Sequence, residues 1–217
     1  MPKPTCSLLA ALVFSALPLR AADPPRPEYP RPDFVRSAWL CLNGPWEFQF
    51  DDRNAGLDEK WYADKKPWGK TISVPYPFQA KASGIGETGF HDVAWYRRSA
   101  AVPADWKGKR VLLRFGAVDY RARVWVNGQL AGQHEGGQTP FAFDVTSLID
   151  PARNLTIVVR AEDPSTDQSI PRGKQFWEEK SRGIWYTRTS GIWQPVWLEP
   201  VSDPHLERIV VRPNPDD

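Results

Sequence analysis

Alternating apolar and polar positions recur along the middle of the chain and predict short β-strands. Residues 111–115, 123–126 and 155–160 each place an apolar side chain at nearly every second position. Successive side chains of a strand point to opposite faces of a sheet, so each run predicts a half-buried strand. Asn127 and Gly128 follow the second run and tolerate the positive φ values that a type I′ hairpin turn requires.

The chain lacks the long 3.6-residue period of an amphipathic helix. Residues 58–62 and 146–149 predict no more than one or two helical turns each. Many short strands without an alternation of strand and helix predict an all-β fold, specifically an antiparallel jelly-roll β sandwich. With 217 residues, of which 41% are hydrophobic, the chain is long enough for one substantial core. We therefore expect a single domain over residues 34–200.

The first 22 residues predict a secretory signal peptide. Lys3 precedes an apolar run from Leu8 to Leu19, which at about a dozen residues is shorter than the ~20 that a membrane span needs. No later apolar stretch is longer, so we expect no membrane span. The signal peptide leads us to expect an exported protein, periplasmic or extracellular. Cys6 is lost with the signal peptide. Cys41, between two leucines, then remains and is predicted to be a buried, inert thiol.

Proline content and charge restrict the picture further. The chain has 22 prolines, and in residues 23–33 nearly every second residue is proline, which predicts an extended linker. The 28 lysines and arginines are balanced by 26 aspartates and glutamates, giving a formal charge of +2. Because a nucleic-acid partner requires a basic surface, we expect no such partner.

Three long loops are predicted, at residues 83–93, 135–140 and 164–191. Loops of this length are uncommon in a compact sandwich unless they bind or cover something. Their composition suits a sugar, because the C–H face of a pyranose stacks on aromatic rings while its hydroxyls need hydrogen-bonding partners. The candidates are Trp177, Trp185, Tyr186 and Trp193 for stacking, and Lys174, Gln175, Glu178, Arg182 and Arg188 for polar contacts. The alternative is that these aromatic residues only pack the loops against the sheets.

The sequence offers little chemistry beyond binding. His91, His134 and His205 lie far apart without a partner cysteine, so neither a metal nor another cofactor is expected. Glu178 and Glu179 are adjacent and would point to opposite sides of an extended chain, whereas a glycosidase pair must face one bond together. We therefore expect no catalytic residue within this chain.

An ordered series of motifs resembles a known family. The motifs are residues 93–98 (VAWYRR), 106–115 (WKGKRVLLRF), 124–128 (VWVNG), 134–141 (HEGGQTPF) and 190–193 (SGIW). Together they resemble the N-terminal sugar-binding domain of glycoside hydrolase family 2, the family of β-galactosidase-like and β-glucuronidase-like enzymes. The resemblance covers nearly all of residues 34–200 and implies a galactose-binding-like jelly roll.

The resemblance also implies further domains. In the family the jelly roll precedes an immunoglobulin-like domain and a TIM barrel, so residues 201–217 are expected to begin a truncated immunoglobulin-like domain, with residues 205–212 as its first strand. The family's acid/base and nucleophile are barrel glutamates, the former directly after an asparagine, and no asparagine here precedes a glutamate. The resemblance therefore implies retaining glycoside hydrolysis by an enzyme whose barrel is missing from this chain, with a carbohydrate substrate as its partner.

The resemblance indicates which loops approach the sugar. In relatives a jelly-roll loop reaches the active site, and some carry an aspartate five residues before the small residue of the small-Gly-Ile motif. Counting back from Ser190, this chain has Trp185 there, which favours a stacking role. The loop before Trp95 also approaches the site in relatives. The predicted substrate-binding set is thus Trp185, Trp177, Gln175, Lys174, Arg188, His91 and Asp92, although His91 and Asp92 could equally form hydrogen bonds that fix their loop.

Two functions remain as alternatives to a glycosidase domain. The first is a free-standing secreted carbohydrate-binding module that uses the same loops. The second is a structural spacer whose sandwich only supports another domain. Saturable sugar binding would favour the module, and its absence would favour the spacer.

Overall fold

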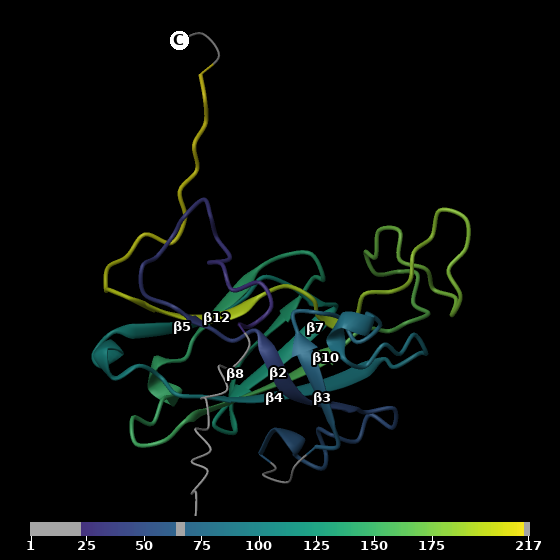
Figure 1. The fold of residues 1–217 in the computed structure, drawn as a ribbon, viewed down its shortest axis with the longest axis horizontal. Helices are drawn as coiled ribbons and strands as arrows, with labels where there is room; N and C mark the ends of the chain where they lie inside the picture. Colours follow the sequence, from purple (N-terminus) through teal and green to yellow (C-terminus); the bar gives the residue numbers. More distant parts are fainter. Residues whose placement is uncertain (1–22, 64–67, 215–217) are drawn as a thin grey trace, which may run out of the picture.

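A computed structural model describes residues 23–63 and 68–214, so the predicted signal peptide lies outside the described residues. It shows a β sandwich with long loops at one end (Figure 1). The strands are β1 (Leu40–Cys41), β2 (Gly44–Phe50), β3 (Lys70–Val74), β4 (Val93–Ala100), β5 (Arg110–Phe115), β6 (Val118–Asp119), β7 (Arg121–Val126), β8 (Gln129–Glu135), β9 (Phe141–Asp144), β10 (Leu155–Glu162), β11 (Gly191–Ile192) and β12 (Val196–Val201).

The strands form two main antiparallel sheets. One has the order β1-β12-β5-β9, and the other has the order β3-β2-β4-β10-β7-β8. A small third sheet pairs β11 with β6. Every pairing between named strands is antiparallel, which confirms the predicted all-β jelly-roll sandwich.

The core lies between the two main sheets, where the predicted alternation places it. Val111, Leu113 and Phe115 of β5 are at most 2% exposed, and they meet Val124 and Val126 of β7 across the sandwich core. Burial of such side chains stabilises the fold by about 1.5–3 kcal/mol each. The three predicted strand runs are therefore confirmed as strands.

The prediction of half-buried strands is wrong for β7 and β10. Trp125 and Val158, on the outer face of the larger sheet, are 6% and 1% exposed. Segment 51–63 folds over this face, and Tyr62 stacks on Trp125 at 4.9 Å between ring centroids. The outer face thus holds a second, aromatic cluster, because a segment without strands supplies a second layer.

The short elements match the sequence patterns. The 3₁₀ turns η1 (Trp61–Ala63) and η4 (Thr146–Leu148) lie in or beside the two segments predicted to be briefly helical, and η2 (Lys81–Ser83) and η3 (Ala104–Trp106) add two more. Asn127 and Gly128 have φ values of 51° and 80° between β7 and β8. Both positive values confirm the type I′ hairpin. No helix in the described part of the chain is long and apolar enough to cross a membrane.

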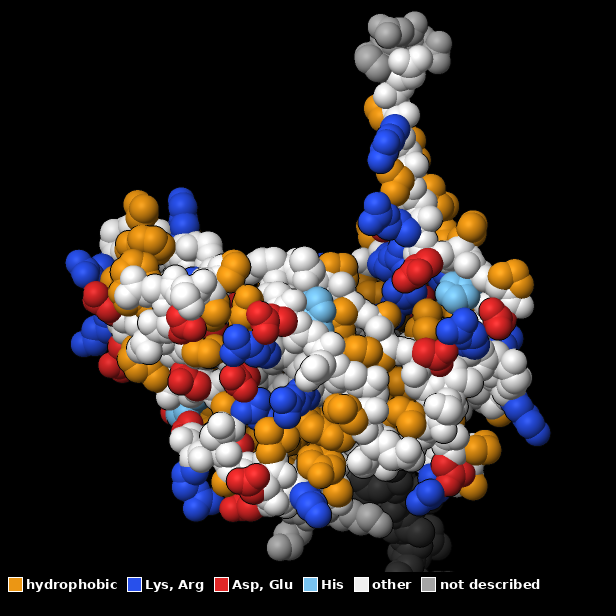
Figure 2. All heavy atoms as spheres, turned by 180° about the vertical axis from the view of Figure 1, so that it is seen from behind, with side chains coloured by type: hydrophobic (Ala, Val, Ile, Leu, Met, Phe, Trp, Pro, Cys, Tyr) orange, Lys and Arg blue, Asp and Glu red, His pale blue; other side chains and the backbone are white. Residues whose placement is uncertain are grey.

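The proline-rich segment and the residues after β12 lie beside one another at the β1-β12-β5-β9 sheet, where Arg31 and Arg36 donate to the carbonyl oxygens of Glu207 and Leu206. Tyr29 of the proline-rich segment packs edge-on against Trp197 of β12. Residues 203–214 form no strand, and the last part of this segment extends away from the sandwich (Figure 1), so the predicted first strand of a following domain stays a prediction. Cys41 is half-buried, less than expected, and burial raises the pKa of its thiol. Figure 2 shows charged side chains of both signs interspersed over the rear face, without a field of one sign.

Candidate functional site

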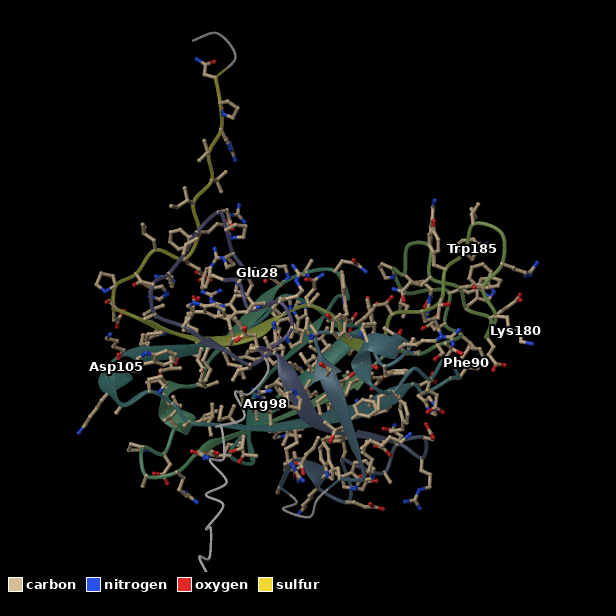
Figure 3. All side chains as sticks on the ribbon, in the orientation of Figure 1. Glu28, Phe90, Arg98, Asp105, Lys180 and Trp185 are labelled. Atoms are coloured by element: carbon tan, nitrogen blue, oxygen red, sulfur yellow. The ribbon has the colours of Figure 1, made fainter. Side chains whose placement is uncertain are left out.

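The three predicted loops meet at one end of the sandwich, which we call the rim and define as residues 84–92, 136–140 and 163–190. In Figure 3, Trp185 and Lys180 lie on the projecting third loop near Phe90, at the opposite end of the molecule from Asp105. Long loops in contact with each other on a rigid sheet scaffold are a common location for binding residues. The rim is therefore the candidate site.

Arg188 joins two of the loops. Its side chain is buried, and its guanidinium donates hydrogen bonds to the carbonyl oxygens of Glu178 at 2.8 Å and Thr88 at 2.6 Å. The guanidinium carbon also lies 4.4 Å from the ring centroid of Phe90. This predicted sugar contact therefore serves to hold the rim together, and any contact with a sugar stays a prediction.

The two predicted stacking tryptophans pack against each other. The ring centroids of Trp177 and Trp185 are 4.8 Å apart, and Trp185 stacks on Phe176 at 5.9 Å. Phe176 is buried, whereas both tryptophans are half-buried. These three rings form a local core for the projecting loop and leave part of each indole surface exposed.

Gln175 and Lys174 lie at the base of the same loop. The Gln175 amide donates to Asp119 Oδ2 at 2.8 Å and accepts from the Thr189 N–H at 2.6 Å. The Lys174 carbonyl accepts from the Tyr186 N–H at 2.8 Å, while its side chain is exposed. Gln175 thus anchors the loop, and the Lys174 ammonium is free to face solvent or a ligand.

His91 and Asp92 lie in the adjoining loop and form the loop-fixing contacts given as their alternative role. The two ring nitrogens of His91 lie 2.7 Å from Asp52 Oδ1 and 3.0 Å from Glu87 Oε1, and the ring stacks on Phe50. Asp92 accepts a hydrogen bond from the Ser165 N–H at 2.8 Å. The structure therefore groups five of the seven candidates in one loop and these two in its neighbour.

A buried polar network beneath the rim was not predicted from the sequence. Asp119 and Asp163 are 3% and 4% exposed. Ser190 donates to Asp163 Oδ2 at 2.5 Å and accepts from the Gln79 amide at 3.0 Å. These residues come from four separate parts of the chain. The sequence gives one local sign of this network, namely that Asp119 is a carboxylate between apolar residues.

Burial governs the ionisation of the two aspartates. Burial, and then the charge of Asp163, raise the pKa of Asp119 to about 7. Burial also raises the pKa of Asp163, against the Ser190 hydrogen bond and the Arg172 charge, which lower it. A buried carboxyl is harder to ionise than an exposed one, and a neighbouring carboxylate such as Asp163 adds to this effect for Asp119. The base of the projecting loop is therefore sensitive to pH.

Replacing Asp119 with Asn should remove part of the pH dependence of stability. Between the ordinary pKa of 3.8 and about 7, the folded chain keeps the Asp119 proton while the unfolded chain releases it. The free energy of unfolding therefore falls as pH rises through this window, by on the order of 4 kcal/mol from this group. Urea denaturation at pH 4, 6 and 8 should show a smaller fall for Asp119→Asn than for the unchanged chain.

Asp105→Asn is the matched control, because this exposed carboxyl lies on η3, far from the rim (Figure 3). It should leave the pH profile of the unchanged chain intact. Parallel profiles for Asp119→Asn and the unchanged chain would contradict the assignment. Asp163 is expected to contribute a further fall in the free energy of unfolding in both Asp119→Asn and the unchanged chain.

Glu178 and Glu179 are exposed, and Glu178 pairs with Arg182 at 3.1 Å. No group of three histidine, cysteine or carboxylate side chains within residues 23–63 and 68–214 is placed to hold a metal ion.

Comparison with known sequences gives a consistent result. A family model described as "Glycosyl hydrolases family 2, sugar binding domain" matches residues 40–198. The β-glucuronidase of Felis catus is 33% identical over 145 residues, covering 61% of this chain and 22% of that protein. The β-galactosidase of Thermoanaerobacter pseudethanolicus is 29% identical over 168 residues, covering 77% and 20%. The chain thus spans only about a fifth of the length of these relatives.

Two solved structures contain this fold as one part of a larger enzyme chain. A β-glucuronidase from Ruminococcus gnavus, in complex with a C6-substituted uronic isofagomine, matches with a TM-score of 0.62 and 26% identity. The match covers 80% of this chain and 30% of that chain. Lactobacillus rhamnosus β-glucuronidase matches with a TM-score of 0.61 and 26% identity, covering 76% and 28%.

Proposed function

The chain belongs to the sugar-binding domains of glycoside hydrolase family 2, and on this premise we propose that it forms the sugar-recognising front of a glycosidase. The observation that carries the proposal is the rim, where Arg188 ties the projecting loop to the 84–92 loop. A projecting loop with a fixed base can position aromatic and polar side chains beside a substrate held elsewhere.

The proposed reaction is retaining hydrolysis of β-glycosides, with glucuronides and galactosides as the substrate classes. Support comes from the relatives, which are named β-glucuronidase and β-galactosidase. One glutamate of a catalytic barrel would protonate the departing oxygen, and another would form the glycosyl intermediate. The residues described here would line the substrate entrance and select sugars that stack on the loop.

Trp185→Ala in the full-length gene product should raise KM for at least one β-glycoside. A stacking ring contributes about 0.5–1.5 kcal/mol beyond its buried area, so the expected rise is roughly 3- to 10-fold. Because the sugar would stack on Trp185 in both the ground state and the transition state, kcat should change little. Steady-state kinetics on p-nitrophenyl β-glucuronide and β-galactoside measure both constants.

Leu130→Ala provides the control, because Leu130 is exposed beside the Asn127-Gly128 turn, at the other end of β8 from the rim. It should leave KM unchanged. Unchanged kinetics for Trp185→Ala on both substrates would count against a rim role for this residue. If the unchanged gene product hydrolyses neither glycoside, the glycosidase proposal is wrong, and a free-standing module gains support.

We also propose that the protein is exported, to the periplasm or beyond. Support comes from the sequence, in which Lys3 and the apolar run from Leu8 to Leu19 have the order of a signal peptide. Export is consistent with an enzyme that acts on glycosides outside the cytoplasm.

A further inference from the structure

The aromatic residues of the rim divide into two groups. Phe176, Trp177 and Trp185 use their ring faces on one another. Tyr186 is 65% exposed, and Trp193 is half-buried. Neither of these two rings packs against another aromatic ring within the described residues. Tyr186 and Trp193 therefore offer ring surface that no other aromatic ring covers, in addition to the exposed parts of the two tryptophans favoured by the sequence.

Tyr186 and Trp193 line the same cleft, which we call the rim cleft. It has a volume of about 410 Å³ and lies between the 136–140 turn and the base of the projecting loop. Gln138, Lys174 and Thr189 also line it. This volume is within the usual range for small-molecule sites.

The walls of the rim cleft are held in place by hydrogen bonds. The Trp193 indole N–H donates to the Gly137 carbonyl at 2.8 Å, which fixes the orientation of the ring. Tyr186 is held through its backbone, since its N–H donates to Lys174 and its carbonyl accepts from Phe176, both at 2.8 Å. A cleft with fixed walls loses little conformational entropy when a ligand binds.

The charges at the rim cleft favour an acidic ligand. The exposed Lys174 ammonium forms no ion pair with the residues that the structure describes. Arg172 also lines the cleft and is 8% exposed, but its Nε and Nη2 donate to the carbonyl oxygens of Asp167 and Pro164, and Nη2 lies 4.0 Å from the Asp163 carboxylate. Lys174 therefore supplies the available positive charge, and an ammonium beside two aromatic rings suits a sugar ring that carries a carboxylate.

We propose that the rim cleft is a subsite for an acidic pyranose, a uronic acid residue that stacks on Tyr186 and Trp193 and whose carboxylate binds Lys174. The proposal rests on the proposed function, since it names the sugar class that the rim would recognise. It adds a second set of stacking contacts, at the base of the loop that carries the Phe176-Trp177-Trp185 cluster.

Fluorine NMR of the chain labelled with 5-fluorotryptophan tests the proposal, because each tryptophan gives its own resonance. Trp→Phe variants assign the signals of Trp177, Trp185 and Trp193. Titration with methyl β-D-glucuronide should shift the Trp193 signal saturably, with a dissociation constant on the order of 1 mM. Methyl β-D-glucoside, the neutral match, should bind about 10-fold more weakly.

Two exposed-residue variants separate stacking from charge recognition. Tyr186→Ala should reduce the affinity for both sugars about 10-fold. Lys174→Gln should reduce glucuronide affinity to that of the glucoside while leaving glucoside affinity unchanged. Because both side chains are exposed, unperturbed signals from the remaining tryptophans will show that the variants are folded.

Three other outcomes would contradict the proposal that the rim cleft is a subsite for an acidic pyranose. A glucuronide-dependent shift confined to Trp177 and Trp185 would refute the cleft and leave the proposed function standing. Equal affinity for glucuronide and glucoside would refute the acidic specificity. If no tryptophan signal moves with either sugar up to roughly 50 mM, the cleft is not a sugar subsite, while kinetics on the full-length gene product test the proposed function separately.

Discussion

Gly191→Ala is expected to reduce the free energy of unfolding by about 5 kcal/mol, enough to unfold a marginally stable domain. Gly191 has a φ of 80°, a conformation that costs an alanine about 1–2 kcal/mol. A Cβ at this position would overlap the Tyr96 hydroxyl oxygen and lie 2.9 Å from its Cζ. Tyr96 is fully buried in the core, so its ring has no space into which it can move. Urea denaturation measures the loss.

The reference for this prediction is Gly183→Ala in the projecting loop. Gly183 has a φ of 59°, but no atom lies within 4 Å of the place that an alanine Cβ would occupy, so only the backbone contribution remains. It should cost about 1–2 kcal/mol. Adding Tyr96→Phe to Gly191→Ala removes the closest clashing atom and should restore part of the loss. Equal effects for the two glycine variants would contradict the packing argument.

The role of Gly191 gives the Ser-Gly-Ile motif a physical meaning. Ser190 hydrogen-bonds to buried Asp163, Gly191 passes over Tyr96, and Ile192 enters the core. Three successive residues thus end the projecting loop and attach it to the sandwich. The sequence pattern located this motif, but only the structure shows that each position has a different neighbour.

The strands and the hairpin turn could be predicted because their signals are local. Alternation within residues 111–115 depends only on neighbouring positions, and Asn127-Gly128 has few ways to form a turn. The outer aromatic cluster could not be predicted. Tyr62 and Trp125 are distant in sequence, and nothing local shows that segment 51–63 folds over the sheet.

The loops that form the rim could be predicted from the sequence, but the contacts of the side chains within them depend on residues far away in the chain. The sequence shows that Arg188 is polar and in a long loop, which fits sugar binding. The structure shows that its guanidinium hydrogen-bonds to the Thr88 carbonyl, 100 residues away. Trp185 is a similar case. The sequence places an aromatic side chain in a long loop, but it does not show whether the ring stacks on a sugar or on Phe176.

Glu199→Ala is the second large expected effect, a loss of about 4 kcal/mol in the free energy of unfolding. Glu199 of β12 is fully buried and accepts hydrogen bonds from Arg114 Nε at 2.5 Å, Tyr29 Oη at 2.7 Å and the Trp197 indole at 3.0 Å. Arg36 forms a further ion pair at 3.2 Å. Removing the carboxylate leaves two arginines beside the sheet without their shared partner, which costs more than the lost contacts alone.

The ionisation of Glu199 sets the pH range of this effect. Burial raises the pKa of the carboxyl, but the hydrogen bonds from Tyr29 and Trp197 and the Arg114 charge outweigh it, so the pKa lies below 4.5. The unfolded chain binds the proton first as pH falls, so the stabilisation is present at neutral pH and is lost in acid. Glu199→Ala should therefore differ most from the unchanged chain near pH 7, and the difference should shrink as pH falls below 4.5.

Tyr29→Phe distinguishes the carboxylate from the segment that it anchors. This change removes one hydrogen bond to Glu199 and keeps the ring packed on Trp39 and Trp197, so the expected loss is about 1 kcal/mol. If Tyr29→Phe and Glu199→Ala reduce the free energy of unfolding by the same amount, attachment of the N-terminal segment through Tyr29 accounts for the loss, and the arginine pairing contributes little. A much larger loss for Glu199→Ala would show that one buried carboxylate joins residues 29–36 to β5 and β12, and that the proline-rich segment is part of the folded sandwich.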